Sequence, residues 1–194
     1  MERIPYASAV GSLMYAQTCT RPDISFVVGM LDRYQSNPGM DHWKAAKKVM
    51  RYLRGTKDYI LTFKRYDNLE VIGYTDSDFT GCVDSRKSTF GYVYLLAGAT
   101  ISWKRLAIVN TIEKPLRIYC DNSAAIFFSK NDKYSNGAKH MELKYFAVKE
   151  EVQKQRVSIE HINTELMVAD PLTKGLPPKT FKEHVKRMGL DCNP

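Results

Sequence analysis

Asp76 and Asp78 lie two residues apart in EVIGYTDSDFTGC, residues 70–82, a segment that otherwise has the composition of a buried strand. Successive side chains of a strand alternate between faces, so these two carboxylates would project side by side with Tyr74. Aspartate is disfavoured in strands and is costly to bury without a partner. The pattern therefore predicts either that the pair lies at a strand end in water or that it holds a cation.

Two later aspartates are predicted to join Asp76. Asp121 ends the predicted strand LRIYCD, and Asp170 lies in VADPLTK before the last predicted helix. The ends of neighbouring strands in an open sheet are where sites assemble. A carboxylate cluster with no Cys or His nearby suits Mg²⁺ or Mn²⁺, and two such ions about 4 Å apart can hold the attacking water and the leaving oxygen of a phosphodiester. We expect Asp76 to bridge the metals and the other two acids to hold one side each.

Each acid also has an ordinary structural interpretation. Asp121 in DNS could cap a helix, and Asp78 could simply face water. Asp170 precedes a proline and could be a turn residue. Taken singly, these interpretations are favoured for every acid except Asp76, and only their order and context together favour a shared site.

Composition narrows the class of protein. The chain has 194 residues, of which 44% are hydrophobic and 26% charged, as in an average globular protein with one core or one domain plus a helical appendage. No apolar run approaches the ~20 residues that cross a bilayer, and MERIPYASAV lacks the apolar centre of a signal peptide. We therefore expect an intracellular protein, cytoplasmic or nuclear, with no membrane partner. The scattered Cys and His residues indicate neither a disulfide framework nor a zinc site.

Several of the positively charged residues recur at helical spacing in residues 41–57. The net charge of +8 favours an acidic partner such as nucleic acid. Residues 41–57 predict an amphipathic helix whose apolar stripe lies opposite a basic face. The basic face consists of Lys44, Lys47, Lys48 and Arg51. It could bind phosphates next to a nucleic-acid site, or it could be the solvated face of a core-packed helix.

The predicted elements change type at Gly55. Helical spacing before it favours helices at 6–19, 22–38 and 41–55. Period-two patterns after it favour three or four antiparallel strands at 59–65, 69–79, 88–98 and 100–105. A strand and a short helix in 115–132, a helix at 138–156, a strand at 157–163, a loop or turn at 167–177 and a closing helix at 178–190 follow. The sequence thus predicts a helical segment, 1–58, and an α/β domain, 59–194.

Four motifs make the sequence resemble a known family. YTDSDFTGCVDSRKSTFGYVYLLAGATISWK, IYCDNSAAIFFSKN, AKHMELKYFAVKEEV and VADPLTKGLP, in this order, resemble the ribonuclease H region at the end of the Pol polyproteins of plant copia-type LTR retrotransposons. Residues 1–58 resemble the connection that follows the reverse transcriptase. The resemblance implies a ribonuclease-H-like mixed sheet, two Mg²⁺ or Mn²⁺ ions on Asp76, Asp121 and Asp170, cleavage of the RNA strand of RNA/DNA hybrids, and reverse transcriptase as a partner in the full polyprotein. His140 falls in a KH motif of the family and is assigned no chemical role.

The sequence departs from that family after ISWK. The family has there a long helix with a metal-binding Glu, whereas only the 11 residues from Arg105 to Pro115 precede the next strand in this chain. A crossover with its helix normally takes at least ~10–12 residues, so a helix of three or more turns with two loops does not fit. Glu113 is the only acid in this gap. Because it lies beside Pro115 and a strand, it is not expected to replace the lost ligand.

Loss of one carboxylate from a cluster that acts as a unit predicts a weak or absent nuclease. Three hypotheses follow from this. The first is a divergent ribonuclease H that also uses Asp78 or Glu113. The second is a non-catalytic remnant that binds nucleic acid, and the third is a retrotransposon fragment with no present function. The sequence has no Tyr-x-Asp-Asp motif, so the chain is not expected to copy nucleic acid.

Overall fold

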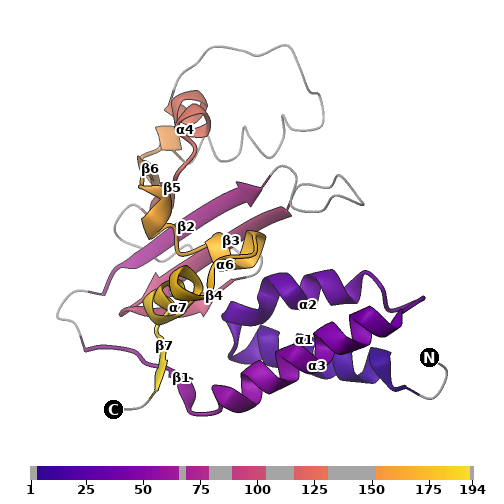
Figure 1. The fold of residues 1–194 in the computed structure, drawn as a ribbon. Coiled ribbons are helices and arrows are strands. Elements are labelled where there is room, and N and C mark those ends of the chain that lie inside the picture. The colour runs from indigo at the N-terminus through magenta and orange to yellow at the C-terminus, as the bar shows by residue number, and fades with distance from the viewer. Residues whose placement is uncertain (1–3, 66–68, 79–88, 104–115, 131–151, 193–194) are drawn as a thin grey trace, which may run out of the picture.

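The computed structural model describes residues 4–65, 69–78, 89–103, 116–130 and 152–192 (Figure 1). In these ranges a group of helices comes first, a mixed five-stranded sheet follows, and two further helices and a short strand end the chain. No helix in this part of the chain is both long and apolar enough to cross a membrane.

Three α-helices precede the sheet. They are α1 (Tyr6–Cys19), α2 (Ser25–Asp32) and α3 (Met40–Gly55), and the 3₁₀ turn η1 (Pro22–Ile24) leads into α2. Their apolar sides form one core, which contains Tyr6, Val10, Leu13, Ile24, Val28, Leu31, Ala46 and Val49. The predicted helix at 22–38 is shorter than expected, because the chain leaves α-helical geometry in tight turns whose amide donors are Tyr34 and Gln35.

The sheet has the strand order β4-β3-β2-β5-β6. Its first part is antiparallel and consists of β2 (Val71–Asp78), β3 (Thr89–Leu96) and β4 (Ala99–Ser102). β5 (Leu116–Cys120) and β6 (Val157–His161) continue from β2 in parallel, and α4 (Ser123–Lys130) contacts both. The predicted α/β class, with antiparallel strands followed by strand, helix and strand, is confirmed. This mixed sheet is compatible with a ribonuclease-H-like fold.

Two short strands lie outside this sheet, contrary to the prediction that 59–65 joins the antiparallel set. β1 (Tyr59–Leu61) pairs antiparallel with β7 (Leu190–Cys192), which directly follows α7 (Pro178–Arg187). The predicted closing helix therefore ends early, at a turn that needs Gly189. This residue has φ +81°, and a Cβ on it would lie 2.6 Å from the Cα of Ala99, so a side chain does not fit.

β4 and β5 are parallel to each other and are separated in the sheet by β3 and β2. The sequence provides residues 103–115 to connect them. The predicted loss of a crossover helix falls at 104–115, outside the described residues. Glu113, His140 and most of the helix predicted at 138–156 also lie outside them.

On one face of the sheet, the short helix α6 (Asp170–Thr173) lies against β3 and β2 and also contacts α2 and η1 (Figure 1). The core under it contains Val93, Leu95, Met167, Val168, Ala169, Leu172 and Met188. Gly91 allows the close approach, because a Cβ there would lie 2.8 Å from Thr173 Cγ2 and 3.0 Å from Leu172 Cβ. Because Gly91 has no side chain, α6 can pack closely on β3 and bring Asp170 to the sheet.

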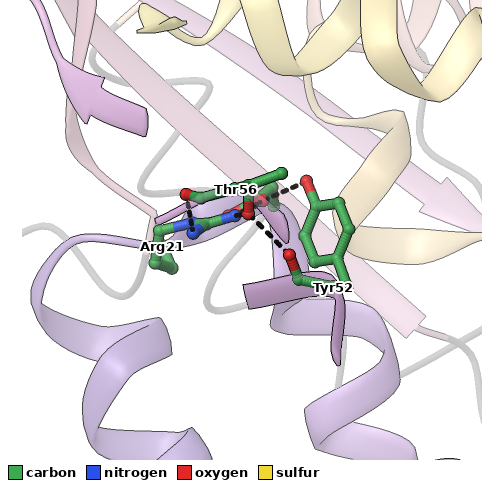
Figure 2. A network of polar contacts seen from close by, with 4 residues as sticks. Arg21, Tyr52 and Thr56 are labelled. Carbon is green, nitrogen blue, oxygen red and sulfur yellow. Dashed lines mark hydrogen bonds and ion pairs between the residues drawn. The ribbon is translucent and has the colours of Figure 1, made fainter. Parts of the chain in front are cut away.

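A buried polar network ties η1 to the end of α3 (Figure 2). Arg21 donates to both carboxylate oxygens of Asp23, at 3.0 and 2.7 Å, and to the hydroxyl and carbonyl oxygens of Thr56, at 2.8 and 3.2 Å. The hydroxyl of Tyr52 donates to Asp23 at 2.6 Å. Because Arg21 and Asp23 are 7% and 2% exposed, each charge depends on the other.

Candidate metal centre

Asp76, Asp121 and Asp170 meet at one edge of the sheet. One carboxylate oxygen of each lies within 4.8 Å of the other two. Asp76 comes from β2, Asp121 directly follows β5, and Asp170 begins α6. β2 and β5 are parallel and pair Thr75 with Cys120, so the next residue of each strand reaches the same edge. The structure therefore brings together the three acids that the sequence singled out.

Asp76 lies on the central strand β2, where burial and a hydrogen bond hold its side chain. Its side chain is 6% exposed, and it lies opposite Gly91 in the β2–β3 register. The hydroxyl of Thr173 donates to Asp76 Oδ2. Because the donor comes from the last residue of α6, this hydrogen bond fixes the carboxylate and the helix relative to each other.

Asp170 is the most deeply buried acid of the cluster, at 3% exposed. Burial is the main cause that raises its pKa to about 6, and the negative charges of Asp76 and Asp121 raise it further. Lys174 acts in the opposite direction. Asp170 Oδ1 is buried, and its partner among the described residues is the Lys174 ammonium, 3.1 Å away. A buried carboxylate oxygen with free acceptor capacity is a fitting ligand for a cation.

Lys174 is a member of the cluster that the sequence reasoning missed. Its Nζ lies 3.1 Å from Asp170 Oδ1 and 3.7 Å from Asp76 Oδ2. The pKa of Lys174 is raised because the acids outweigh the lowering effect of its burial. The i,i+4 spacing of Asp170 and Lys174 in DPLTK was the available signal, since such spacing favours an ion pair on a helical turn.

The donor set fits Mg²⁺ or Mn²⁺. All the candidate ligands are carboxylate oxygens, which these hard ions prefer, and two of the three acids are buried where an uncompensated charge is costly. Asp121 is the most exposed acid, so the cluster opens toward solvent on its side. Lys174 supplies the positive charge that the described residues offer to the cluster.

The other candidate residues are placed as follows. Asp78 ends β2 opposite Thr89, and its side chain is outside the described part of the structure. The four residues of the predicted basic face all lie on the exposed side of α3: Lys44, Lys47, Lys48 and Arg51. Lys44 pairs with Asp41 at 2.9 Å on the exposed surface. A pair of this kind contributes little to stability, so the face remains available to phosphates.

Comparison with known proteins gives Pol polyproteins as relatives along most of the chain and a protein of another description along about half of it. A retrovirus-related Pol polyprotein from transposon TNT 1-94 of Nicotiana tabacum is 36% identical over all of this chain, and one from transposon RE2 of Arabidopsis thaliana is 31% identical over 95% of it. The chain spans 17% and 15% of these two proteins. A protein described as secreted RxLR effector protein 161, from Plasmopara viticola, is 45% identical over 54% of this chain and 73% of its own length. No family model and no solved structure matches.

The alignments also show that this chain is shorter than the matching polyprotein segments. The alignment to the tobacco protein has 224 positions and this chain has 194 residues, so at least 30 positions of that protein have no counterpart here. The alignment to the Arabidopsis protein, with 217 positions, is likewise longer than the chain. The chain is therefore homologous to one segment of the retrovirus-related Pol polyproteins of plant transposons.

Proposed function

We propose that the chain is a ribonuclease-H-like fragment of a retrotransposon Pol polyprotein, whose site takes a divalent cation and RNA/DNA hybrids but hydrolyses the RNA strand weakly or not at all. The observation that carries this proposal is the convergence of Asp76, Asp121 and Asp170 within 4.8 Å. The order of the mixed sheet and the homology to Pol polyproteins support it.

Each acid has a distinct part in this proposal. Mg²⁺ or Mn²⁺, two ions in an intact family site, would supply charge stabilisation for a phosphodiester and a bound water of lowered pKa. Asp76, already oriented by β2 and Thr173, is the fixed ligand of the set. Asp121 lies on the open side, where a nucleic-acid strand can approach. Asp170 closes the cluster from the side of α6.

The proposed loss of nuclease activity follows from the number of residues that this chain lacks relative to the tobacco polyprotein. At least 30 positions of the tobacco polyprotein are missing here, and residues 103–115 alone connect the parallel strands β4 and β5. A crossover helix carrying a fourth carboxylate is the element that this connection would lose. Two-ion hydrolysis needs ligands for both ions, and removal of one member of such a unit removes most of the activity.

The test is cleavage of an end-labelled RNA/DNA hybrid by the purified chain with Mg²⁺ or Mn²⁺, beside Asp76→Asn. We expect the wild-type rate to lie within about tenfold of the variant. In a chimera, the corresponding longer segment of the tobacco polyprotein replaces residues 103–115. This chimera is expected to cleave the hybrid at least about 100-fold faster than the wild type, and Asp76→Asn in the chimera is expected to abolish the gain.

Two outcomes would contradict the proposal in different ways. Fast cleavage by the wild type, lost in Asp76→Asn, would show that the missing segment is dispensable and would direct attention to Asp78 and Glu113. A chimera that folds and binds Mn²⁺ but does not cleave would reject the ribonuclease assignment itself.

A non-catalytic role in binding nucleic acid is a second candidate, favoured by the exposed basic side of α3. Substitution of Lys44, Lys47 and Lys48 by Gln should weaken hybrid binding at least about tenfold. It should also reduce the steepness of the slope of log K against log salt concentration by about 2 to 3. A matched control removes three exposed lysines from α7, which are Lys179, Lys182 and Lys186. Equal weakening by both sets would mean that net charge, and not the α3 face, determines binding.

A further inference from the structure

Lys174 holds an unusual position for a lysine. Its side chain is 30% exposed, and its ammonium contacts two carboxylates that are themselves almost fully buried. Buried acids without a positive partner would repel each other, and their transfer from water would be unfavourable. Among the described residues, the Lys174 ammonium is the cation that relieves this repulsion for Asp76 and Asp170.

The backbone holds this lysine at the cluster. Lys174 directly follows α6, and its amide donates to the carbonyl of Asp170 at 3.1 Å. The preceding residue, Thr173, donates its hydroxyl to Asp76. The side chain of Lys174 therefore starts one helical turn after Asp170 and next to the residue that contacts Asp76, so little conformational freedom is lost when the ammonium contacts both acids.

The contacted atoms are also those that a metal would need. Nζ lies 3.1 Å from the buried Asp170 Oδ1 and 3.7 Å from Asp76 Oδ2, which also accepts from the hydroxyl of Thr173. A divalent cation on the same carboxylates would stand a few ångströms from the ammonium and would be repelled by it. A metal ion and the Lys174 ammonium therefore compete for the position beside the carboxylates of Asp76 and Asp170.

We propose that Lys174 is a built-in counter-cation of the acid cluster, which holds Asp76 and Asp170 together in the metal-free protein and which a divalent cation must displace in order to bind. This inference rests on the proposed function, since it assumes that the three acids form a metal site. Its consequence is that Lys174 stabilises the metal-free protein and weakens metal binding.

The test compares Lys174→Met with the wild type and with a control, Lys179→Met, which removes an exposed lysine from α7. Mn²⁺ affinity is measured by calorimetry and metal-free stability by thermal unfolding in a chelator. We expect Lys174→Met to bind Mn²⁺ at least about tenfold more tightly and to unfold at a lower temperature when metal-free. Lys174→Arg, which keeps the charge, should restore the metal-free stability, and Lys179→Met should match the wild type in both measurements.

A second measurement uses the wild-type protein, in case Lys174→Met does not fold. The ¹³Cε resonance of Lys174 is followed by NMR during titration with Mg²⁺ and should move to the position of a solvated lysine as the site fills. A resonance that stays unchanged at saturation overturns the inference, as does equal or weaker Mn²⁺ binding by Lys174→Met. If neither protein binds Mn²⁺, the metal site of the proposed function fails and this inference fails with it. Equal affinities overturn the inference alone.

Discussion

At the residue scale, Asp170 is both buried and close to two other negatively charged side chains. Its carboxylate is 3% exposed and shares the cluster with Asp76 and Asp121, so its ionised form is unfavourable in the folded protein. Lys174 compensates only in part, because the pKa of Asp170 is still raised to about 6. A metal-free site of this kind is electrostatically strained, and the strain depends on pH.

The first prediction concerns that dependence. The folded pKa of about 6 lies above the ordinary value of 3.8, so the folded state binds this proton more tightly than the unfolded state. The contribution of Asp170 to the free energy of unfolding of the metal-free protein therefore falls as pH rises from about 4 to about 6, by an amount on the order of 2 kcal/mol. Asp170→Asn removes the effect, and its free energy of unfolding should exceed that of the wild type by more at pH 7 than at pH 4.5.

Urea unfolding of both proteins in a chelator measures this difference. His184 acts in the opposite sense, because burial lowers the pKa of this 1% exposed histidine, and stability from it is lost as pH falls. Its contribution is present in both proteins and cancels in the comparison. A difference between Asp170→Asn and the wild type that stays constant with pH would contradict the prediction.

The residues of the site were predictable from the sequence to different degrees. The sequence predicted the two strands that carry Asp76 and Asp121 and the convergence of their ends, but their parallel pairing became known only from the structure. The i,i+4 spacing in DPLTK indicates only that Lys174 pairs with Asp170, whereas the contacts of Thr173 and Lys174 with Asp76 depend on the close packing of α6 on β3. Their contribution became visible only with the tertiary structure.

At the element scale, the position of α6 depends on Gly91. A Cβ there would lie 2.8 Å from Thr173 Cγ2 and 3.0 Å from Leu172 Cβ, both close to the backbone of α6, so the helix would have to move. We predict that Gly91→Ala destabilises the protein by about 1–3 kcal/mol and lowers its Mn²⁺ affinity, although Gly91 carries no ligand.

Chemical denaturation and Mn²⁺ titration check this prediction together. Gly11→Ala in α1 is the matched control, since no atom lies within 4 Å of a Cβ built there. It should stabilise the helix by up to about 1 kcal/mol and leave metal affinity unchanged. If Gly91→Ala also left the affinity unchanged, α6 would not be what positions Asp170.

The Arg21 network gives a second prediction at this scale. Arg21→Met would leave the carboxylate of Asp23 buried with only the hydroxyl of Tyr52 as a hydrogen-bond donor among the contacts described here. We predict a loss of about 3–5 kcal/mol, as for other buried pairs broken on one side. The double variant Arg21→Met/Asp23→Asn removes both charges and should recover part of this loss.

A double-mutant cycle on the free energy of unfolding tests the network. Strictly additive effects of the two substitutions would show that the two charges do not depend on each other. The network escaped the sequence analysis because Arg21 and Thr56 are 35 residues apart and meet only when α3 folds back beside η1. The pairing of β1 with β7 escaped it for the same reason, since each strand is three residues long and the partners lie at opposite ends of the α/β part.

At the scale of the whole molecule, the described residues form two separate apolar cores. One belongs to the N-terminal helices and the other lies between the sheet and α6. They are linked by contacts of α6 with α2 and η1, by a hydrogen bond of 2.8 Å from Trp103 Nε1 to the carbonyl of Gln17, and by an edge contact between Tyr52 and Phe181. The helices thus support the element that carries Asp170.

The last prediction follows from this support. A fragment of residues 59–194 keeps the sheet, α6 and the three acids, but it exposes the surfaces that Trp103 and Phe181 turn toward the helices. We predict that the fragment is less stable than the full chain by about 2 kcal/mol or more, from lost apolar burial and one lost hydrogen bond. Its Mn²⁺ affinity should fall as well, because α6 loses its contacts with α2 and η1.

Fluorescence makes this measurable, because the chain has two tryptophans and the fragment retains only Trp103. Its emission should lie at longer wavelength than in the full-length variant Trp43→Phe, and addition of a peptide of residues 1–58 should reverse the shift and restore the metal affinity. If the fragment instead unfolded at the same urea concentration and bound Mn²⁺ as tightly as the full chain, the helices would be an independent unit. The support that they give to α6 would then be unnecessary for the site.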